Sequence, residues 1–164
     1  IIIGIKSTVL SKKEKLFLNK YKPWGVILFS RNLKKFKQIQ KLITDIKSIF
    51  KDNKYPILID QEGGKINRLN KLIDTSVLTA EFYGNLYKSD KKKFSNYYRV
   101  YINQISYLLN ELGININTVP VLDVRRSKSS NIIGDRSYSY IPEMYLKLGI
   151  FVFKNLVRDE LVPL

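Results

Sequence analysis

One short segment of the sequence, "YPILIDQEGGKINRL" at residues 55–69, combines side chains that could bind a polar ligand. An apolar run ends in Asp60, and Glu62, two glycines and Arg68 follow. A carboxylate accepts hydrogen bonds from hydroxyls, and a guanidinium donates them in a rigid fork. Asp60 and Arg68, together with the distant Arg136, therefore suit a sugar with neighbouring hydroxyls. Salt bridges on the surface or between strands explain the same residues equally well.

The same segment gives little support to a metal or phosphate site. Asp60 and Glu62 could share a hard cation, but Mg²⁺ and Ca²⁺ normally require more oxygen ligands nearby. The glycine pair permits a tight turn and close approach of a ligand. The chain contains neither a P-loop (GxxxxGK[ST]) nor a G-x-G-x-x-G pattern after a strand. We therefore predict neither a metal nor a cofactor.

Two absent residue types narrow the chemistry further. The chain has no cysteine, which excludes disulfides and thiolate metal sites, and no histidine, the commonest general acid or base. Hydrolysis of a sugar linkage would require paired carboxylates about 5–10 Å apart. The residues alone therefore predict a polar pocket around Asp60 in an α/β protein, and no reaction.

The charge of the 164-residue chain is strongly positive, at +15. Such a charge suits nucleic acid or an anionic membrane, but Lys is accompanied here by abundant Ile, Asn and Tyr, the residues that AT-rich coding sequence over-supplies. The lysines are scattered, with short runs only at 34–35 and 91–93. The apolar start, "IIIGIKS", is too short for a signal segment or a membrane span. We predict a cytoplasmic protein that binds neither nucleic acid nor membranes.

Apolar runs of strand length alternate with segments of helical periodicity, which indicates a parallel sheet covered by helices, either doubly wound or a barrel. In both folds, functional side chains gather beyond the carboxyl ends of the strands. Asp60, Arg31, Asn32 and Asp123 follow three of the strands and are expected at one edge. The predicted strands are 1–5, 24–29, 55–59, 114–122 and an opening fifth at 161–164; the clearest predicted helices are 11–21, 36–50, 97–112 and 142–158.

Four motifs occur in order along the chain: "GVILFSRN" (25–32), "PILIDQEGGKINRL" (56–69), "GININTVPVLDV" (113–124) and "IGDRSY" (133–138). Together they closely resemble the N-terminal part of glycoside hydrolase family 3, in its bacterial β-N-acetylglucosaminidase branch. The resemblance implies a TIM (β/α)8 barrel that removes terminal N-acetylglucosamine from β-linked glycans with retention of configuration. In this branch the substrates are cell-wall fragments that are recycled in the cytoplasm.

The resemblance also assigns roles to individual residues. Asp60, Arg68 and Arg136 match the residues that hold the sugar in the −1 subsite. Asp123 matches a family aspartate at a strand end, with either a structural role or a contact, and Glu62 is interpreted as structural.

The family's Lys-His motif, its Asp-His acid/base pair and its aspartate nucleophile have no counterpart in these 164 residues, so no catalytic residue is predicted in this chain. A whole barrel needs about 250 residues. We therefore expect residues 1–164 to form the N-terminal part of one truncated catalytic domain, with four to five of the eight βα units, and to be inactive alone. The alternatives are a residual sugar-binding module and, less favoured, a basic nucleic-acid-binding protein.

Overall fold

The computed structural model describes residues 1–124 and 133–164, which form an α/β fold around a five-stranded parallel sheet. The strands follow one another across the sheet in the order in which they occur along the chain. Sequential parallel strands are joined by crossover connections, most of which contain a helix. This arrangement confirms the predicted alternation of strands and helices. The strands are β1 (Ile2–Gly4), β2 (Gly25–Leu28), β3 (Ile57–Ile59), β4 (Ile116–Asn117) and β5 (Val162–Pro163).

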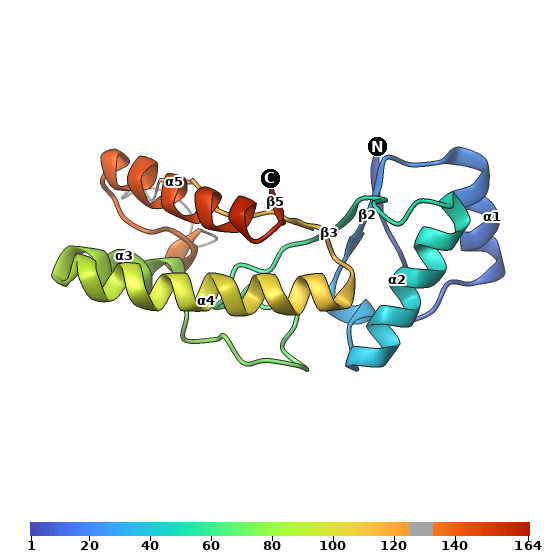
Figure 1. The fold of residues 1–164 in the computed structure, drawn as a ribbon, viewed down its shortest axis with the longest axis horizontal. Helices are drawn as coiled ribbons and strands as arrows, with labels where there is room; N and C mark the ends of the chain where they lie inside the picture. Colours follow the sequence, from blue (N-terminus) through green and yellow to red (C-terminus); the bar gives the residue numbers. More distant parts are fainter. Residues whose placement is uncertain (125–132) are drawn as a thin grey trace.

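The helices lie in two groups (Figure 1): α1 and α2 at one end of the molecule, and α3, α4 and α5 at the other. The predicted capping box is present, since Ser11 accepts from the Glu14 amide while Glu14 accepts from the Ser11 amide. Gly113 adopts φ 87° after α4, as predicted for the residue that ends a helix. The helices are α1 (Lys12–Tyr21), α2 (Phe36–Phe50), α3 (Ala80–Ser89), α4 (Lys91–Leu112) and α5 (Pro142–Arg158), with short 3-10 turns η1 (Ser30–Asn32) and η2 (Gly134–Arg136).

Two predicted elements differ most from the structure. Helix α4 begins six residues before the predicted start at 97, because the Asp90 side chain caps it by accepting from the Lys92 and Lys93 amides. Strand β4 is much shorter than the predicted 114–122, because the chain turns directly after Asn117, where the Val119 amide donates to the Asn117 carbonyl at 2.8 Å. The predicted polar loop begins at Asn131, which lies outside the described residues together with Ile132.

The central strands are buried, as their near-continuous apolar sequences predict. All three residues of β3 are at most 1% exposed, and Leu28 of β2 is fully covered. Helix α2 packs Ile39, Leu42, Ile43 and Ile46 into the same core. The sheet is thus a rigid base for the loops that follow β2, β3 and β4.

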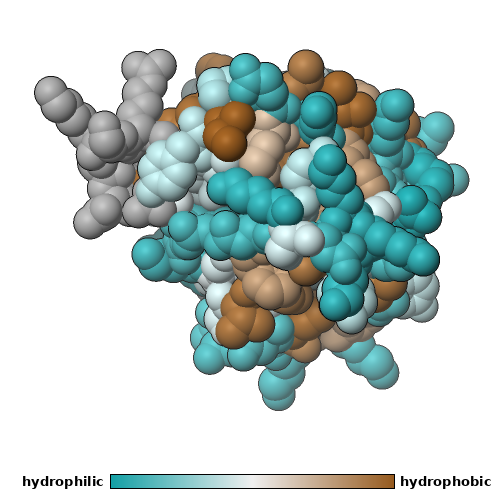
Figure 2. All heavy atoms as spheres, turned by 90° about the vertical axis from the view of Figure 1, so that its left-hand side faces the viewer, coloured by the Kyte–Doolittle hydropathy of each residue, from teal (hydrophilic) through white to brown (hydrophobic). Residues whose placement is uncertain are grey.

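Helix α5 is apolar on two sides. One side is buried, but Leu146, Ile150, Phe153 and Val157 form a second stripe and are each 46–67% exposed. The end of the molecule that α3, α4 and α5 form carries hydrophilic side chains across its middle, with hydrophobic ones above and below (Figure 2). Across the described ranges, 1–124 and 133–164, every helix is too short or too polar to cross a membrane.

Candidate functional site

The loop after β3 returns on itself and brings together two of the three predicted binding residues, Asp60 and Arg68. Gly63 and Gly64 adopt φ values of 91° and 56°, which L side chains rarely tolerate. A Cβ on Gly63 would also lie 2.3 Å from the Leu78 carbonyl oxygen, so only glycine fits there. The Gly63–Ile66 bridge closes the turn, and the chain then runs back so that Arg68 faces Asp60.

A buried glutamine fixes this loop to the sheet. Gln61 is 2% exposed, and its amide donates to Asn117 Oδ1 at 3.0 Å. Its side chain donates to Asn67 Oδ1 at 3.1 Å and accepts from the Leu69 amide at 3.1 Å. A buried polar network of this kind is rigid when its members are paired. Asp60 directly precedes Gln61, and Arg68 directly follows Asn67. The backbone at both positions is therefore held in place.

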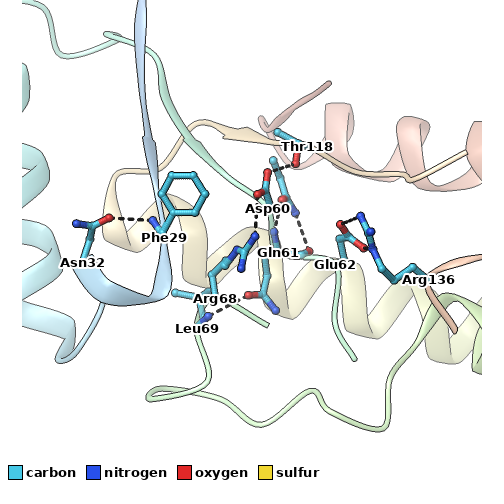
Figure 3. Close-up of polar contacts among 10 residues, drawn as sticks. Phe29, Asn32, Asp60, Gln61, Glu62, Arg68, Leu69, Thr118 and Arg136 are labelled. Atoms are coloured by element: carbon cyan, nitrogen blue, oxygen red, sulfur yellow. Dashed lines mark hydrogen bonds and ion pairs between the residues drawn. The ribbon is translucent and has the colours of Figure 1, made fainter. Parts of the chain in front are cut away.

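Asp60 is hydrogen-bonded through both carboxylate oxygens (Figure 3). Arg68 Nη2 donates to Oδ2 at 3.1 Å and Thr118 Oγ1 donates to Oδ1 at 2.7 Å. The Asp60 and Arg68 side chains are 23% and 25% exposed. A carboxylate oxygen can accept more than one hydrogen bond. Asp60 thus keeps acceptor capacity although both its oxygens are oriented.

Glu62 makes a different pair with Arg136, which lies in the η2 turn. Nε and Nη2 of Arg136 each donate to one Glu62 oxygen at 2.8 Å, in a two-pronged geometry. These hydrogen bonds raise the pKa of Arg136, and the charges of Asp123 and Asp60 act in the same direction, against the effect of burial. The interpretation of Glu62 as a structural residue agrees with this geometry.

Both pairs line one open cavity of about 600 Å³ at the carboxyl end of the strands. Asp123 and Thr118 line it as well. The structure therefore brings together all five predicted residues, Asp60, Glu62, Arg68, Asp123 and Arg136. Within the part of the chain that the structure describes, no three Asp and Glu residues gather in the way that a metal site requires.

Asn32 lies at this edge, in η1 after β2, but it does not reach the cavity. Asn32 is fully buried, and its Nδ2 donates to the carbonyl oxygens of Ile5 and Ser7 at 3.2 and 2.8 Å. Arg31 Nε donates to the Ile5 carbonyl as well, at 2.9 Å. Neither residue lines the cavity around Asp60. They tie the end of β2 to the segment after β1.

Several tyrosines pack behind Glu62, among them Tyr83, Tyr98, Tyr101 and Tyr138. Burial raises the pKa of Tyr101 to about 12, and burial also raises the pKa of Tyr98 and Tyr138. These hydroxyls stay protonated near neutral pH, so they do not serve as bases there. Tyr101 donates to the Glu62 carbonyl oxygen at 3.5 Å, and the Tyr98 and Tyr138 hydroxyls pair with each other.

The comparisons with known proteins agree with this arrangement. The family model for the N-terminal domain of glycosyl hydrolase family 3 matches residues 4–163. The chain belongs to glycosyl hydrolase family 3. It is 32% identical to beta-hexosaminidase A of Pseudoalteromonas piscicida over 147 residues. This alignment covers 87% of this chain and 24% of that protein.

Solved structures of the family share the fold. Native NagZ from Neisseria gonorrhoeae superimposes with a TM-score of 0.85 at 24% identity, over 97% of this chain and 46% of NagZ. NagZ in complex with N-trifluoroacetyl-D-glucosamine gives 0.78 at 24% identity, over 97% of this chain and 47% of that one. The α/β barrel fold is thereby confirmed for the described strands. The chain spans between about a quarter and a half of these family 3 proteins.

Sequence reasoning missed Thr118, which contributes a hydrogen bond to Asp60. Thr118 directly follows β4, and its amide donates to the Ile59 carbonyl at 2.9 Å. This pairing places the Thr118 hydroxyl beside Asp60, the residue after Ile59. The predicted strand 114–122 placed Thr118 inside the strand, so no sequence signal indicated its position beside Asp60; that position follows from the early end of β4 at Asn117.

Proposed function

We propose that this chain supplies the part of a β-N-acetylglucosaminidase that binds the terminal N-acetylglucosamine ring. The observation that carries the proposal is that Asp60, Arg68 and Arg136 line the same open cavity at the carboxyl end of parallel strands. In barrel enzymes this edge holds the active site. Membership of glycosyl hydrolase family 3 and the names of the relatives support the substrate class.

Within this proposal, each residue has a distinct part. Asp60 accepts hydrogen bonds from sugar hydroxyls, and Arg68 fixes its carboxylate and donates to the ring. Arg136 donates from the opposite side, and Glu62 sets its direction. A carboxylate and two guanidinium groups that are already oriented need little reorganisation to bind vicinal hydroxyls. Such preorganisation raises affinity because less side-chain freedom is lost on binding. Asp123 faces the cavity from the β4 side.

The wider setting belongs to the proposal too. We infer that the parent activity is the retaining release of N-acetylglucosamine from peptidoglycan fragments in the cytoplasm. The resemblance of the four sequence motifs supports this setting, as does the structural likeness to a protein solved with N-trifluoroacetyl-D-glucosamine.

Binding is tested by calorimetric titration of the polypeptide with N-acetylglucosamine, with glycerol at equal concentration as the control. We expect millimolar binding of the sugar and none of glycerol, because glycerol lacks the fixed ring geometry. Equal heats from both ligands, or no heat from the sugar, would contradict the proposal.

Hydrolysis requires more than this site provides. The 164-residue polypeptide has no histidine, and Asp60 and Glu62 both carry arginine partners in the described structure. We therefore expect this polypeptide alone to leave a chromogenic β-N-acetylglucosaminide intact over hours. Release of chromophore that disappears on Asp60→Ala substitution would refute the expectation.

A further inference from the structure

Phe29 directly follows β2 and lies near two arginine side chains. The Cζ atom of Arg31 is 4.6 Å from the centroid of its ring, and that of Arg68 is 5.5 Å away. Figure 3 shows the ring next to the Arg68 guanidinium, on the side away from Glu62. A guanidinium within about 6 Å of an aromatic face is attracted to it electrostatically. Phe29 is thus in contact with the Asp60 site although it does not line the cavity.

The Phe29 backbone is itself firmly held. Its amide donates to Asn32 Oδ1 at 2.9 Å, and Asn32 is fully buried and donates to the Ile5 and Ser7 carbonyl oxygens. On the β1 side, a Cβ on Gly4 would lie 3.1 Å from the ring, so the glycine lets the ring pack closely there. The ring therefore has a fixed position relative to two strands.

Arg68 has few other supports. Its Nη2 donates to Asp60, but its Nε is buried and has no hydrogen-bond partner among the described residues. A long side chain held at one point keeps several rotamers available. An aromatic face stacked on the guanidinium removes that freedom without requiring a hydrogen bond. The Phe29 ring, whose centroid is 5.5 Å from Arg68 Cζ, is placed to restrict the guanidinium in this way.

We propose that Phe29 is a positioning residue of the sugar site, whose ring holds the Arg68 guanidinium against Asp60. This inference rests on the proposed function, because it treats the Asp60–Arg68 pair as the sugar-binding group. Phe29 restricts the rotamers of Arg68 in the free protein. Arg68 therefore loses less conformational entropy when the sugar binds. Removal of the ring should therefore weaken sugar binding while Asp60 and its bond to Thr118 remain.

The test compares Phe29→Leu, which removes the ring, with Phe29→Tyr, which keeps it. Phe50→Leu is the matched control, because Phe50 stacks on Tyr55 at 3.8 Å, between α2 and β3 and outside the cavity lining. We expect about fivefold weaker binding of N-acetylglucosamine for Phe29→Leu, in line with a cation–π contact, and unchanged binding for Phe29→Tyr and Phe50→Leu.

A second readout does not depend on the sugar. The Arg68 Nε–H resonance, assigned from its absence in Arg68→Lys, should be shifted by the ring current of Phe29. It should move in Phe29→Leu and stay in Phe50→Leu. The inference is overturned if Phe29→Leu leaves this resonance in place, or if Phe29→Tyr weakens binding as much as Phe29→Leu. Absence of sugar binding by the unmodified chain would instead refute the proposed function. An increase in Arg68 Nε mobility by ¹⁵N relaxation in Phe29→Leu, and none in Phe50→Leu, would still show that Phe29 holds Arg68; no increase in Phe29→Leu would overturn the inference.

Discussion

Asp60 and Glu62 are two residues apart, and each pairs with an arginine, yet the two pairs are built differently. Glu62 meets Arg136 with both oxygens and is 11% exposed. Asp60 meets Arg68 through one nitrogen and is 23% exposed. Each carboxylate accepts two hydrogen bonds from the protein, but Glu62 receives both from Arg136 in a fork. Asp60 receives one from Arg68 and one from Thr118 and is the more exposed of the two, so a ligand can reach it more easily. Similar residue types thus form a clamp in one place and an open site in the other.

The partners also differ in their distance along the chain. Arg68 is eight residues from Asp60, inside the same loop. Arg136 is 74 residues from Glu62 and lies in η2, beside a second ion pair between Lys65 and Asp135 at 3.6 Å. The Glu62 pair therefore joins two distant segments, and we expect it to matter more for the fold than the Asp60 pair does.

The largest effect on binding should come from Asp60→Asn. The substitution keeps the shape of the side chain but removes the negative charge that we propose attracts the sugar hydroxyls. A hydrogen bond to a charged group contributes about 1.5–3 kcal/mol, so N-acetylglucosamine should bind at least about tenfold more weakly by calorimetry. The midpoint of urea unfolding should change little. Unchanged affinity would show that Asp60 is as closed to ligands as Glu62.

Glu62→Gln should reduce stability more than sugar binding, the reverse of Asp60→Asn. It removes one prong of a largely buried fork, which we expect to cost about 2 kcal/mol of unfolding free energy. Urea unfolding followed by circular dichroism measures this loss, and the affinity for the sugar should fall less than in Asp60→Asn. The comparison breaks down if Glu62→Gln leaves stability intact and abolishes binding.

Thr118→Val should have the smallest effect. It removes the hydroxyl that orients Asp60 Oδ1, and a net loss of about 1 kcal/mol corresponds to roughly fivefold weaker sugar binding. Thr118→Ser should restore the affinity, since the hydroxyl is kept. Thr44→Val is the control, because the Thr44 hydroxyl donates to the Gln40 carbonyl within α2. A loss with Ser as large as that with Val would mean that the methyl group, and not the hydroxyl, is important.

Much of the fold could be predicted because it depends on local patterns. The apolar spacing in α2 and the proline at the start of α5 gave the bounds of both helices. The early start of α4 was missed because the three lysines after Asp90 interrupt the apolar pattern. The short β4 depends on how its backbone pairs with β3, which no local pattern records.

The site could be predicted only in part. The glycine pair and Arg68 share one segment with Asp60, so their proximity followed from a turn. The pairing of Arg136 with Glu62, and not with Asp60, depends on how η2 packs against the loop after β3. The Thr118 contact likewise depends on strand register. Such contacts between distant segments form through tertiary packing, and their sequence signal is weak.

Residue-resolved mapping of sugar binding tests the central claim most directly. N-acetylglucosamine is titrated into the uniformly ¹⁵N-labelled polypeptide, and the amide resonances are followed. The account predicts that the signals of Gln61, Leu69 and Thr118 shift together along one saturable curve, while those of α2 stay in place. Shifts centred on other residues, or a spectrum that does not change at saturating sugar, would contradict it.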